Sequence, residues 1–246
     1  MTGEPCWLEP DWSLPPGVAA RQTLRSGGVS VRPYVSLNLG DHVGDRPQAV
    51  AENWRRAAAG LPGEPIRLAQ VHGISVVDAA TVQGRVEADA CFTRQPGVVC
   101  SIMTADCLPV LFCADDGSAV AAAHAGWRGL QSGVLEATIA ALALPPERLW
   151  CWLGPAIGPQ AFEVGEEVRA AFMQDCPADA VAFQPGVQPG KWYADIFQLA
   201  RLRLERAGLG RIDGGGVCTV SDPARFFSYR RDGVTGRMAT MIWRTA

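Results

Sequence analysis

Three short β-prone runs follow one another in the middle of the chain with no helical pattern between them. They cover residues 98–104, 110–114 and 119–124, and a turn sequence, Asp-Asp-Gly-Ser at residues 115–118, separates the last two. We expect these segments to form a meander or hairpin that buries both of its faces. Strands in runs, rather than in strict alternation with helices, favour an α+β protein with a layered α-β-β-α arrangement over a Rossmann sheet.

The remaining elements follow from apolar periodicity and from helix start and stop signals. A helix is expected to begin after Gly126, to carry Leu130, Val134 and Ile139 along one side, and to stop at Pro145. Asp195 is expected to cap a later helix. Two further helices are predicted at residues 165–175 and 195–208, and three further strands at 149–153, 217–220 and 239–243.

Composition and the absence of long linkers limit which class of protein this chain can be. No long linker or repeat divides the chain, so we expect one domain over residues 1–246. The formal net charge of −3 provides no basic field for nucleic acid or an anionic membrane. No secretory signal pattern and no apolar run of 18 residues is visible, and the eight cysteines are widely spaced. We therefore expect a cytoplasmic protein with free thiols.

The chain contains only three histidines, and two of them stand in segments that could bind a metal. His72 lies in Gln-Val-His-Gly, Cys107 in Thr-Ala-Asp-Cys-Leu-Pro, and His124 in Ala-His-Ala-Gly-Trp-Arg-Gly. Two neutral imidazoles and a thiolate suit Zn²⁺ and leave a fourth position open for water or substrate. Cys107 and His124 should lie at one edge of adjacent strands. The alternative is two hydrogen-bonded histidines and a core cysteine.

Arg128 follows Gly126 at the expected start of a helix. Free backbone N–H groups and the helix dipole favour an anion at such a position, so a phosphate could bind beside His124. The alternative is a surface arginine that pairs with Glu136 or with solvent.

An aromatic and basic segment occupies residues 218–237. Its aromatic side chains, Phe226, Phe227 and Tyr229, could stack against a heteroaromatic ring, with Arg230 or Arg231 at the polar edge of that ring. The alternative is a loop that is anchored on the core.

Several enzyme classes are excluded by missing motifs. The chain has no Gly-x-Gly-x-x-Gly, no Walker loop, no His-Glu-x-x-His, no Gly-x-Ser-x-Gly, and neither half of the zinc nucleobase deaminase signature. Three histidines are also too few for a multicopper oxidase with a trinuclear cluster.

Nearly the whole sequence resembles the YfiH-like family, whose members are described as polyphenol oxidases, multicopper laccase-like oxidoreductases and purine nucleoside phosphorylases. The shared motifs occur in order along the chain: Leu24–Ser30, Ser36–Gly40, His42–Asp45, Gln70–Gly73, Glu87–Ala90, Thr104–Pro109, His124–Gly129, Gly154–Gly158, Phe162–Val164, Cys218–Thr219, Phe227–Asp232 and Gly236–Arg237. One departure is that Trp54 follows Asn53, where the family usually has an arginine, and Arg55 comes only after it.

The resemblance implies a fold similar to the layered α-β-β-α architecture of cysteine-histidine toxin deamidases. It implies metal ligands, and catalytic residues, at His72, Cys107 and His124. It also implies phosphate-dependent cleavage of adenosine, inosine and methylthioadenosine, with adenosine deamination as a further activity.

On this basis we expect an enzyme that binds purine nucleosides and phosphate through Arg128, Tyr229 and Arg231, as a monomer or homodimer. The expected cofactor is Zn²⁺, with Cu²⁺ also possible, and Asp89 and Asp106 are expected to support the ligands. A copper-dependent phenol oxidation side activity, a metal-free cysteine hydrolase or amidase, and a non-enzymatic zinc-stabilised module remain alternatives.

Overall fold

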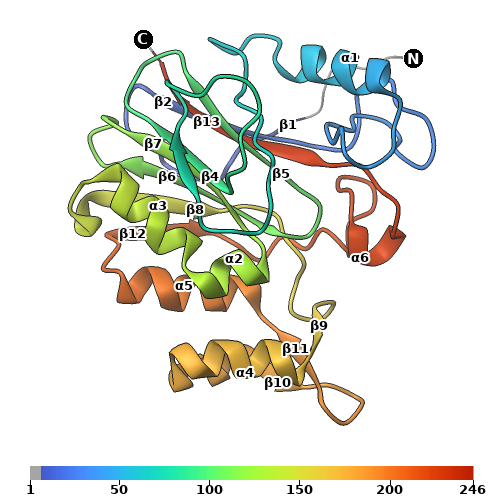
Figure 1. Ribbon diagram of the computed structural model, residues 1–246, viewed down its shortest axis with the longest axis vertical. Coiled ribbons are helices and arrows are strands. Elements are labelled where there is room, and N and C mark those ends of the chain that lie inside the picture. The colour runs from blue at the N-terminus through green and yellow to red at the C-terminus, as the bar shows by residue number, and fades with distance from the viewer. Residues whose placement is uncertain (1–6, 246) are drawn as a thin grey trace.

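The computed structural model describes residues 7–245, in which two β-sheets are stacked and carry helices on their outer faces (Figure 1). The four-stranded sheet has the order β1-β2-β13-β5 and the six-stranded sheet the order β12-β8-β6-β7-β4-β3. The first sheet comprises β1 (Trp7–Leu8), β2 (Val18–Thr23), β13 (Met238–Arg244) and β5 (Val99–Thr104). The second comprises β12 (Arg211–Gly214), β8 (Leu149–Leu153), β6 (Leu108–Ala114), β7 (Val120–Ala125), β4 (Ala90–Thr93) and β3 (Val76–Asp78).

The helices and a small third sheet complete the described chain. The helices are α1 (Pro47–Ala57), α2 (Trp127–Ser132), α3 (Val134–Leu142), α4 (Glu166–Asp175), α5 (Ile196–Arg206) and α6 (Tyr229–Asp232). The small sheet has the order β10-β11-β9, with β10 (Phe183–Pro185), β11 (Lys191–Ala194) and β9 (Glu163–Gly165), and it lies beside α4 (Figure 1). None of these helices is long and apolar enough to cross a bilayer.

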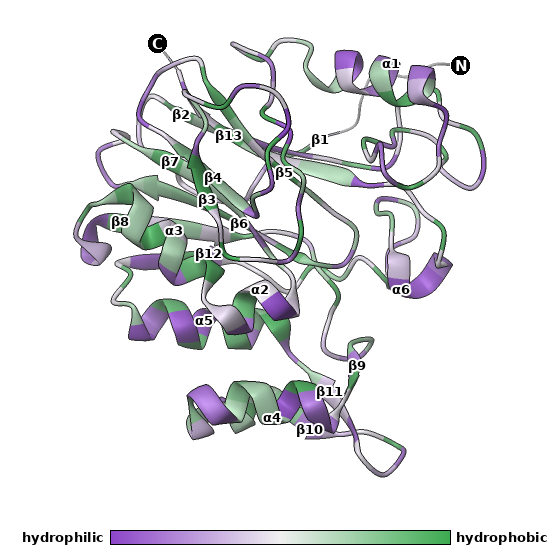
Figure 2. Ribbon diagram, viewed as in Figure 1, coloured by the Kyte–Doolittle hydropathy of each residue, from purple (hydrophilic) through white to green (hydrophobic). Residues whose placement is uncertain are grey.

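Apolar side chains fill the space between these layers. One cluster lies between the two sheets and includes Leu111 of β6, while the next residue, Phe112, belongs to the cluster under α3 and α5. A third cluster joins Trp54 of α1 to Met241 of β13. Because β6 is buried on both faces, it is apolar along its whole length instead of alternating. Figure 2 shows this hydrophobic colour along the central strands and hydrophilic stretches on α4 and α5.

The structure confirms the mixed α and β class, whereas the likeness to toxin deamidases and the single domain stay predictions. The expected hairpin is present, since β6 and β7 are antiparallel with Pro109 opposite His124. The expected meander is wrong in its first strand, because β5 pairs with β13 in the other sheet. The chain crosses between sheets at Asp106, whose φ of 91° turns the backbone sharply.

Two other segments differ from the expectation, and both differences arise at glycine. The predicted single helix after Gly126 is divided into α2 and α3 at Gly133, which has a φ of 103°. The strand predicted at 217–220 is wrong, because the strand β12 lies earlier, where it pairs in parallel with β8. Three successive glycines with positive φ, at residues 214–216, then end it. The other predicted helices and strands are present within a few residues, and Asp195 caps α5 by accepting a hydrogen bond from the N–H of Gln198.

All seven cysteines in the described part of the chain are free thiols, as expected. The eighth, Cys6, lies outside the described residues.

Candidate functional site

Three segments that are remote in sequence bring His72, Cys107 and His124 together. Cys107 immediately precedes β6 and His124 lies near the end of β7, so the antiparallel register places both at one edge of the six-stranded sheet. His72 reaches the same point from an exposed loop, with 3.8 Å between its Nε2 and Cys107 Sγ. One donor atom from each of the three residues lies within 4.8 Å of the other two. The convergence expected from sequence is therefore present.

Asp89 holds both histidines in place. Its fully buried carboxylate accepts hydrogen bonds from the N–H groups of Val71, His72 and Gly73 at 3.1, 2.9 and 2.6 Å, and from His124 Nδ1 at 2.8 Å. Burial raises the pKa of Asp89, but the hydrogen bonds of His124 and of the backbone N–H groups outweigh burial and leave the pKa below its usual value. These bonds also stabilise the left-handed backbone of His72, whose φ is 62°.

The charges of Cys107 and His124 favour an ion pair when no metal is bound. Burial raises the pKa of Cys107, but interactions with His124 and His72 lower it to about 6. Burial lowers the pKa of His124, but Cys107 and Asp89 raise it to about 9. Because Nδ1 of His124 is bonded to Asp89, its Nε2 is the nitrogen that remains for Cys107 or for a metal ion.

The donor set fits a metal ion. Tetrahedral zinc with nitrogen and sulfur ligands separates those ligand atoms by roughly 3.3–3.7 Å, so side-chain shifts of under about 1 Å complete the site. Gly126 provides the room, because a Cβ at this position would lie 2.7 Å from His72 Cδ2 and 3.1 Å from Cys107 Sγ. Two imidazoles with one thiolate are ligands that both Zn²⁺ and copper accept.

The three side chains line a cavity of about 550 Å³. All three histidines of the chain contribute to its lining, together with two arginines, and no acidic residue of the described chain does. The lining residues are His42, Ala69, Gln70, His72, Arg85, Met103, Thr104, Ala105, Cys107, His124, Tyr229 and Arg237. Tyr229 is 61% exposed, so its ring is accessible at this cavity. The cavity is suited to a neutral or anionic ligand.

Asp106 has a different role from the one expected for it. Its carboxylate accepts hydrogen bonds from Thr219 Oγ1 at 2.5 Å, Ser228 Oγ at 3.0 Å and the N–H of Arg230 at 2.7 Å. These contacts fix the start of α6, and with it Tyr229, beside the cavity. Asp106 thus positions a wall of the cavity, whereas Asp89 alone of the two supports the histidines.

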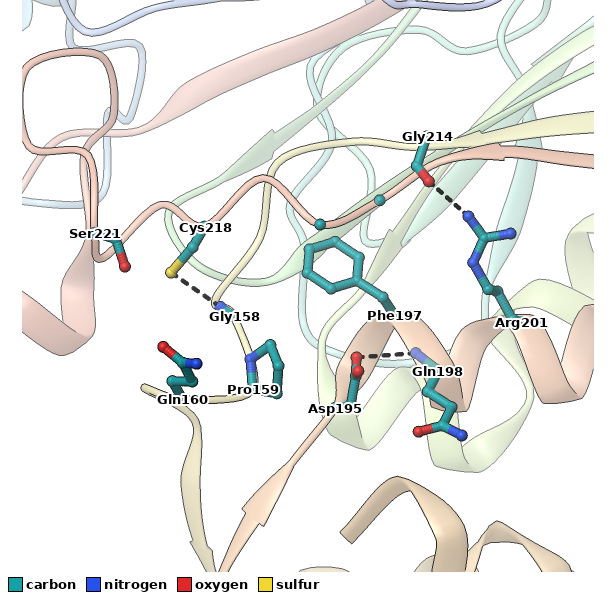
Figure 3. A pocket seen from close by; sticks show the side chains of 12 residues that line it. Gly158, Pro159, Gln160, Asp195, Phe197, Gln198, Arg201, Gly214, Cys218 and Ser221 are labelled. Atoms are coloured by element: carbon teal, nitrogen blue, oxygen red, sulfur yellow. Dashed lines mark hydrogen bonds between the residues drawn. The ribbon is translucent and has the colours of Figure 1, made fainter. Parts of the chain in front are cut away.

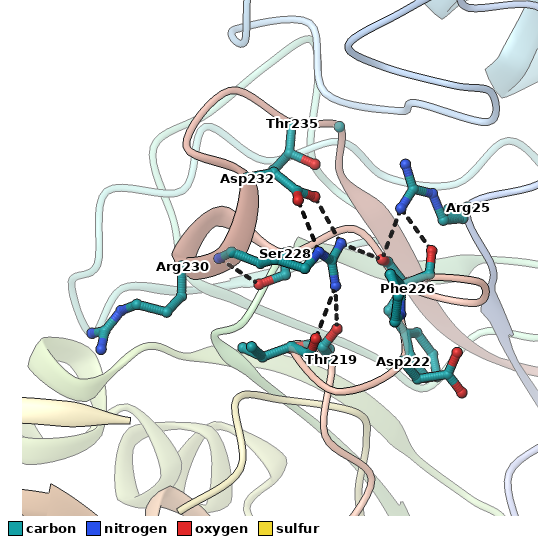
Figure 4. A network of polar contacts seen from close by, with 12 residues as sticks. Arg25, Thr219, Asp222, Phe226, Ser228, Arg230, Asp232 and Thr235 are labelled. Atoms are coloured by element: carbon teal, nitrogen blue, oxygen red, sulfur yellow. Dashed lines mark hydrogen bonds and ion pairs between the residues drawn. The ribbon is translucent and has the colours of Figure 1, made fainter. Parts of the chain in front are cut away.

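The structure does not bring the predicted arginines to this cavity. Arg128 is exposed, and its guanidinium stacks on Trp127 with 4.5 Å to the ring centroid. The guanidinium of Arg231 donates to the carbonyl oxygens of Thr219, Val220 and Phe226 and pairs with Asp232, within the polar network of Figure 4. The phosphate role expected of both stays a prediction, and the lining of the cavity lends it no support.

Two of the three aromatic residues proposed for ring stacking are in the core. Phe226 and Phe227 are fully buried and pack with Leu24 and Met238, so they cannot meet a ligand. The stacking role expected for them is wrong, because both side chains are buried in this apolar cluster. Only Tyr229 remains available.

The unusual position after Asn53 does not affect the cavity. The Asn53 side chain bonds to Ser30, Ser36, Asn38 and the N–H of Val29. Trp54 lies on the buried side of α1 and packs against β13, and Arg55 is exposed and pairs with Glu52. Both therefore serve the local structure of α1.

Sequence reasoning assigned no role to four lining residues that have basic or hydroxyl side chains: His42, Arg85, Thr104 and Arg237. Three of them, His42, Thr104 and Arg237, lie within motifs that support the family resemblance. Their membership in those motifs could have marked them as site residues, whereas their chemistry alone did not. Arg85 stands in no such motif.

A second cavity, of about 490 Å³, lies beside Cys218 (Figure 3). The Cys218 sulfur accepts a hydrogen bond from the N–H of Gly158 at 3.2 Å. Burial raises the pKa of Cys218, but hydrogen bonds from Ser221, Gly158 and Val220 lower it below its usual value. Cys218 is therefore, with Cys107, a thiol that alkylating reagents are expected to label.

Known proteins resemble this chain along almost its whole length. Residues 19–245 match the sequence model of a family described as multi-copper polyphenol oxidoreductase laccase. A purine nucleoside phosphorylase of Pseudomonas aeruginosa is 55% identical over 237 residues, which cover 96% of this chain and 98% of that protein. The purine nucleoside phosphorylase YfiH of Escherichia coli is 55% identical over 240 residues, with the same coverage.

Solved structures agree with these sequence comparisons. A Neisseria meningitidis protein has a TM-score of 0.94 and 51% identity, and the match covers 98% of this chain and 99% of that one. YlmD from Geobacillus stearothermophilus has a TM-score of 0.90 and 32% identity, with coverage of 98% and 96%.

Proposed function

The chain belongs to the family described as multi-copper polyphenol oxidoreductase laccase, and from this premise we propose that it is a purine nucleoside phosphorylase with Zn²⁺ at His72, Cys107 and His124. The observation that carries the proposal is the convergence of this triad in a cavity whose lining is cationic and aromatic and lacks acidic residues. Such a cavity suits a neutral nucleoside together with a phosphate anion. The relatives that are 55% identical bear the same activity in their names.

The proposed substrates are adenosine, inosine and methylthioadenosine. A phosphate oxygen forms a bond to C1′ of the sugar while the bond from C1′ to the base nitrogen breaks. The base takes that electron pair and a proton, and the products are the free base and the sugar 1-phosphate. The transition state resembles an oxocarbenium ion, as in glycoside hydrolysis.

Each residue of the site has a defined task in this proposal. The metal, when bound, supplies positive charge that orients phosphate. Asp89 fixes the orientation of His124 and the backbone of His72, so the ligand geometry is set before substrate enters. Tyr229 stacks on the purine, at a position that Asp106 fixes.

Incubation of the purified protein with adenosine, with and without phosphate, tests the proposal alongside elemental analysis of bound metal. We expect adenine and ribose 1-phosphate to form only when phosphate is present. We also propose that the protein deaminates adenosine. Formation of inosine from adenosine in the same incubation would report this activity. If neither adenine nor inosine forms at any metal loading, the nucleoside assignment fails.

Substitution Cys107→Ala separates a catalytic site from a structural one. We expect loss of turnover with a melting temperature close to that of the metal-free native protein, because the side chain is small and lies at the edge of the core. Wholesale unfolding of this variant would instead indicate a structural metal.

A second candidate function is favoured by the order of contacts from Cys107 to His124 to Asp89. A thiolate next to an imidazole that a carboxylate orients is the arrangement of a cysteine hydrolase or amidase. Metal-stripped protein that stays active and is labelled at Cys107 by a substrate-like electrophile would favour this function. A multicopper laccase with a trinuclear cluster needs more histidine ligands than the three in this chain. Three histidines do allow weak phenol oxidation by a single copper ion at the triad.

A further inference from the structure

We propose that Arg237 and Thr104 form the phosphate-binding subsite of this cavity, with Arg85 as an additional cation. The identification of the anion as phosphate rests on the proposed function. The evidence for an anion-binding subsite comes from the contacts of Arg237 and Thr104 and does not depend on that function.

The guanidinium of Arg237 forms no ion pair with a carboxylate of residues 7–245, although the charge of Asp106 acts on it from a greater distance. It lines the cavity half-buried, and it donates only to the carbonyl oxygens of Thr235 and Gly236, at 3.2 and 3.1 Å. No described carboxylate forms an ion pair with it, whereas Arg85, in the same cavity, pairs with Asp41 at 2.7 Å. A half-buried cation without a counter-ion favours an anionic ligand.

The stem of Arg237 is held in a fixed path. Its backbone N–H donates to Asn38 Oδ1 at 2.9 Å. A Cβ on Gly40 would lie 2.8 Å from Arg237 Cγ, so only glycine leaves room for this stem. Because the guanidinium is held before a ligand arrives, less conformational entropy is lost on binding.

Thr104 provides the second, independent observation. It ends β5, lines the cavity and is 2% exposed, and its hydroxyl has no hydrogen-bond partner among residues 7–245. Buried hydroxyl groups in proteins are almost always paired with protein, water or ligand. A phosphate oxygen would provide that partner.

A second guanidinium lies in the same cavity. Arg85 shares its charge with Asp41 at 2.7 Å, so we expect it to contribute less to anion binding than Arg237.

Calorimetric titration of inorganic phosphate into the zinc-loaded protein, without nucleoside, tests the subsite. We expect Arg237→Met to weaken phosphate binding by about 30-fold and Thr104→Val by about 5-fold, as for the loss of charged and neutral hydrogen bonds. Thr104→Ser, which keeps the hydroxyl, should restore binding to within about twofold of the native protein. Arg55→Met is the matched control, because this exposed arginine pairs with Glu52 on the outer side of α1.

Kinetics provide a second measurement. In Arg237→Met the KM for phosphate should rise while the KM for nucleoside changes by less than about twofold. Arg237→Lys keeps the charge and serves if the methionine variant does not fold, and it should retain weakened phosphate binding.

The outcomes separate this proposal from the proposed function. Unchanged phosphate affinity in Arg237→Met, or a large loss in Arg128→Met instead, overturns the subsite. A nucleoside 5′-phosphate that binds through Arg237 more tightly than inorganic phosphate overturns the assignment of the anion. Phosphate binding that depends on Arg237 in a protein without nucleoside turnover would leave the subsite in place and remove only the phosphorylase activity.

Discussion

At the scale of single residues, one carboxylate organises the whole site. Asp89 accepts four hydrogen bonds, three from the backbone around His72 and one from His124, and it is fully buried. A buried carboxylate with four donors is fixed in position and charge, so the two histidines are oriented by a group that does not itself line the cavity.

Substitution Asp89→Asn should weaken the metal site and the fold together. The amide has one acceptor oxygen for four donors, so we expect a loss of about 2–4 kcal/mol in unfolding free energy. Zinc affinity should fall about 10–100-fold, as for other groups that orient a metal-bound histidine. Denaturant unfolding and competitive zinc titration measure the two effects, and unchanged zinc affinity would show that Asp89 does not orient His124.

The low pKa of Cys107 predicts how its reactivity depends on pH. Because His124 and His72 lower this pKa from 9 to about 6, the metal-free protein carries the thiolate at pH 7. The rate of alkylation by iodoacetamide should therefore be constant from about pH 7 upward and fall as the pH drops through 6. Peptide mass spectrometry must separate Cys107 from Cys218, and a midpoint near 9 at Cys107 would contradict the ion pair.

At the scale of secondary-structure elements, the crossing between the two sheets also builds the cavity. The turn at Asp106 links the end of β5 to the start of β6, and its carboxylate binds the start of α6. The turn at Asp106 therefore positions both Cys107, which follows it in the chain, and Tyr229, which its carboxylate holds through Ser228 and Arg230.

Substitution Asp106→Asn should loosen α6 without affecting the metal. Asparagine tolerates the positive φ at this position but offers one acceptor for three donors, so unfolding free energy should fall by about 2 kcal/mol. The KM for nucleoside should rise several-fold because Tyr229 is no longer held, while zinc content stays at one ion per chain. A loss of zinc with an unchanged KM would show that Asp106 supports the ligands after all.

At the scale of the whole molecule, the packing of the layers does not involve the proposed metal site. The chain exposes 10610 Å², against roughly 38,000 Å² for an unfolded chain of this mass, and the apolar clusters between the layers lie away from the triad. We therefore expect a metal bound at the triad to add its binding energy to a fold that does not depend on it.

Removal of zinc by a chelator should lower the stability but leave the protein folded. Binding of a ligand at a thousand times its Kd stabilises a protein by about 4 kcal/mol, so the melting temperature should drop by roughly 8–16 °C and return on reloading. Circular dichroism and thermal unfolding measure both. Loss of secondary structure at room temperature would instead support the non-enzymatic zinc-stabilised module.

The sequence by itself determined the donor set of the proposed metal site and most of the regular elements. With only three histidines, few ligand sets exist, and apolar runs such as β6 and β7 fix their own pairing and so place Cys107 beside His124. Local patterns suffice there, because hydrophobic runs, turns and ligand chemistry depend on residues that are near in sequence.

Only the tertiary structure decided which side chains face the cavity. In the folded chain β5 pairs within the other sheet and Phe226 is buried. Arg231 donates to carbonyl oxygens, whereas the stem of Arg237 passes Gly40 and its side chain lines the cavity. Each of these outcomes depends on contacts between segments that are far apart in the chain. The direction of a side chain is set by such packing. Residue type alone does not distinguish Arg231, which pairs with Asp232, from Arg237, for which we propose an anionic ligand.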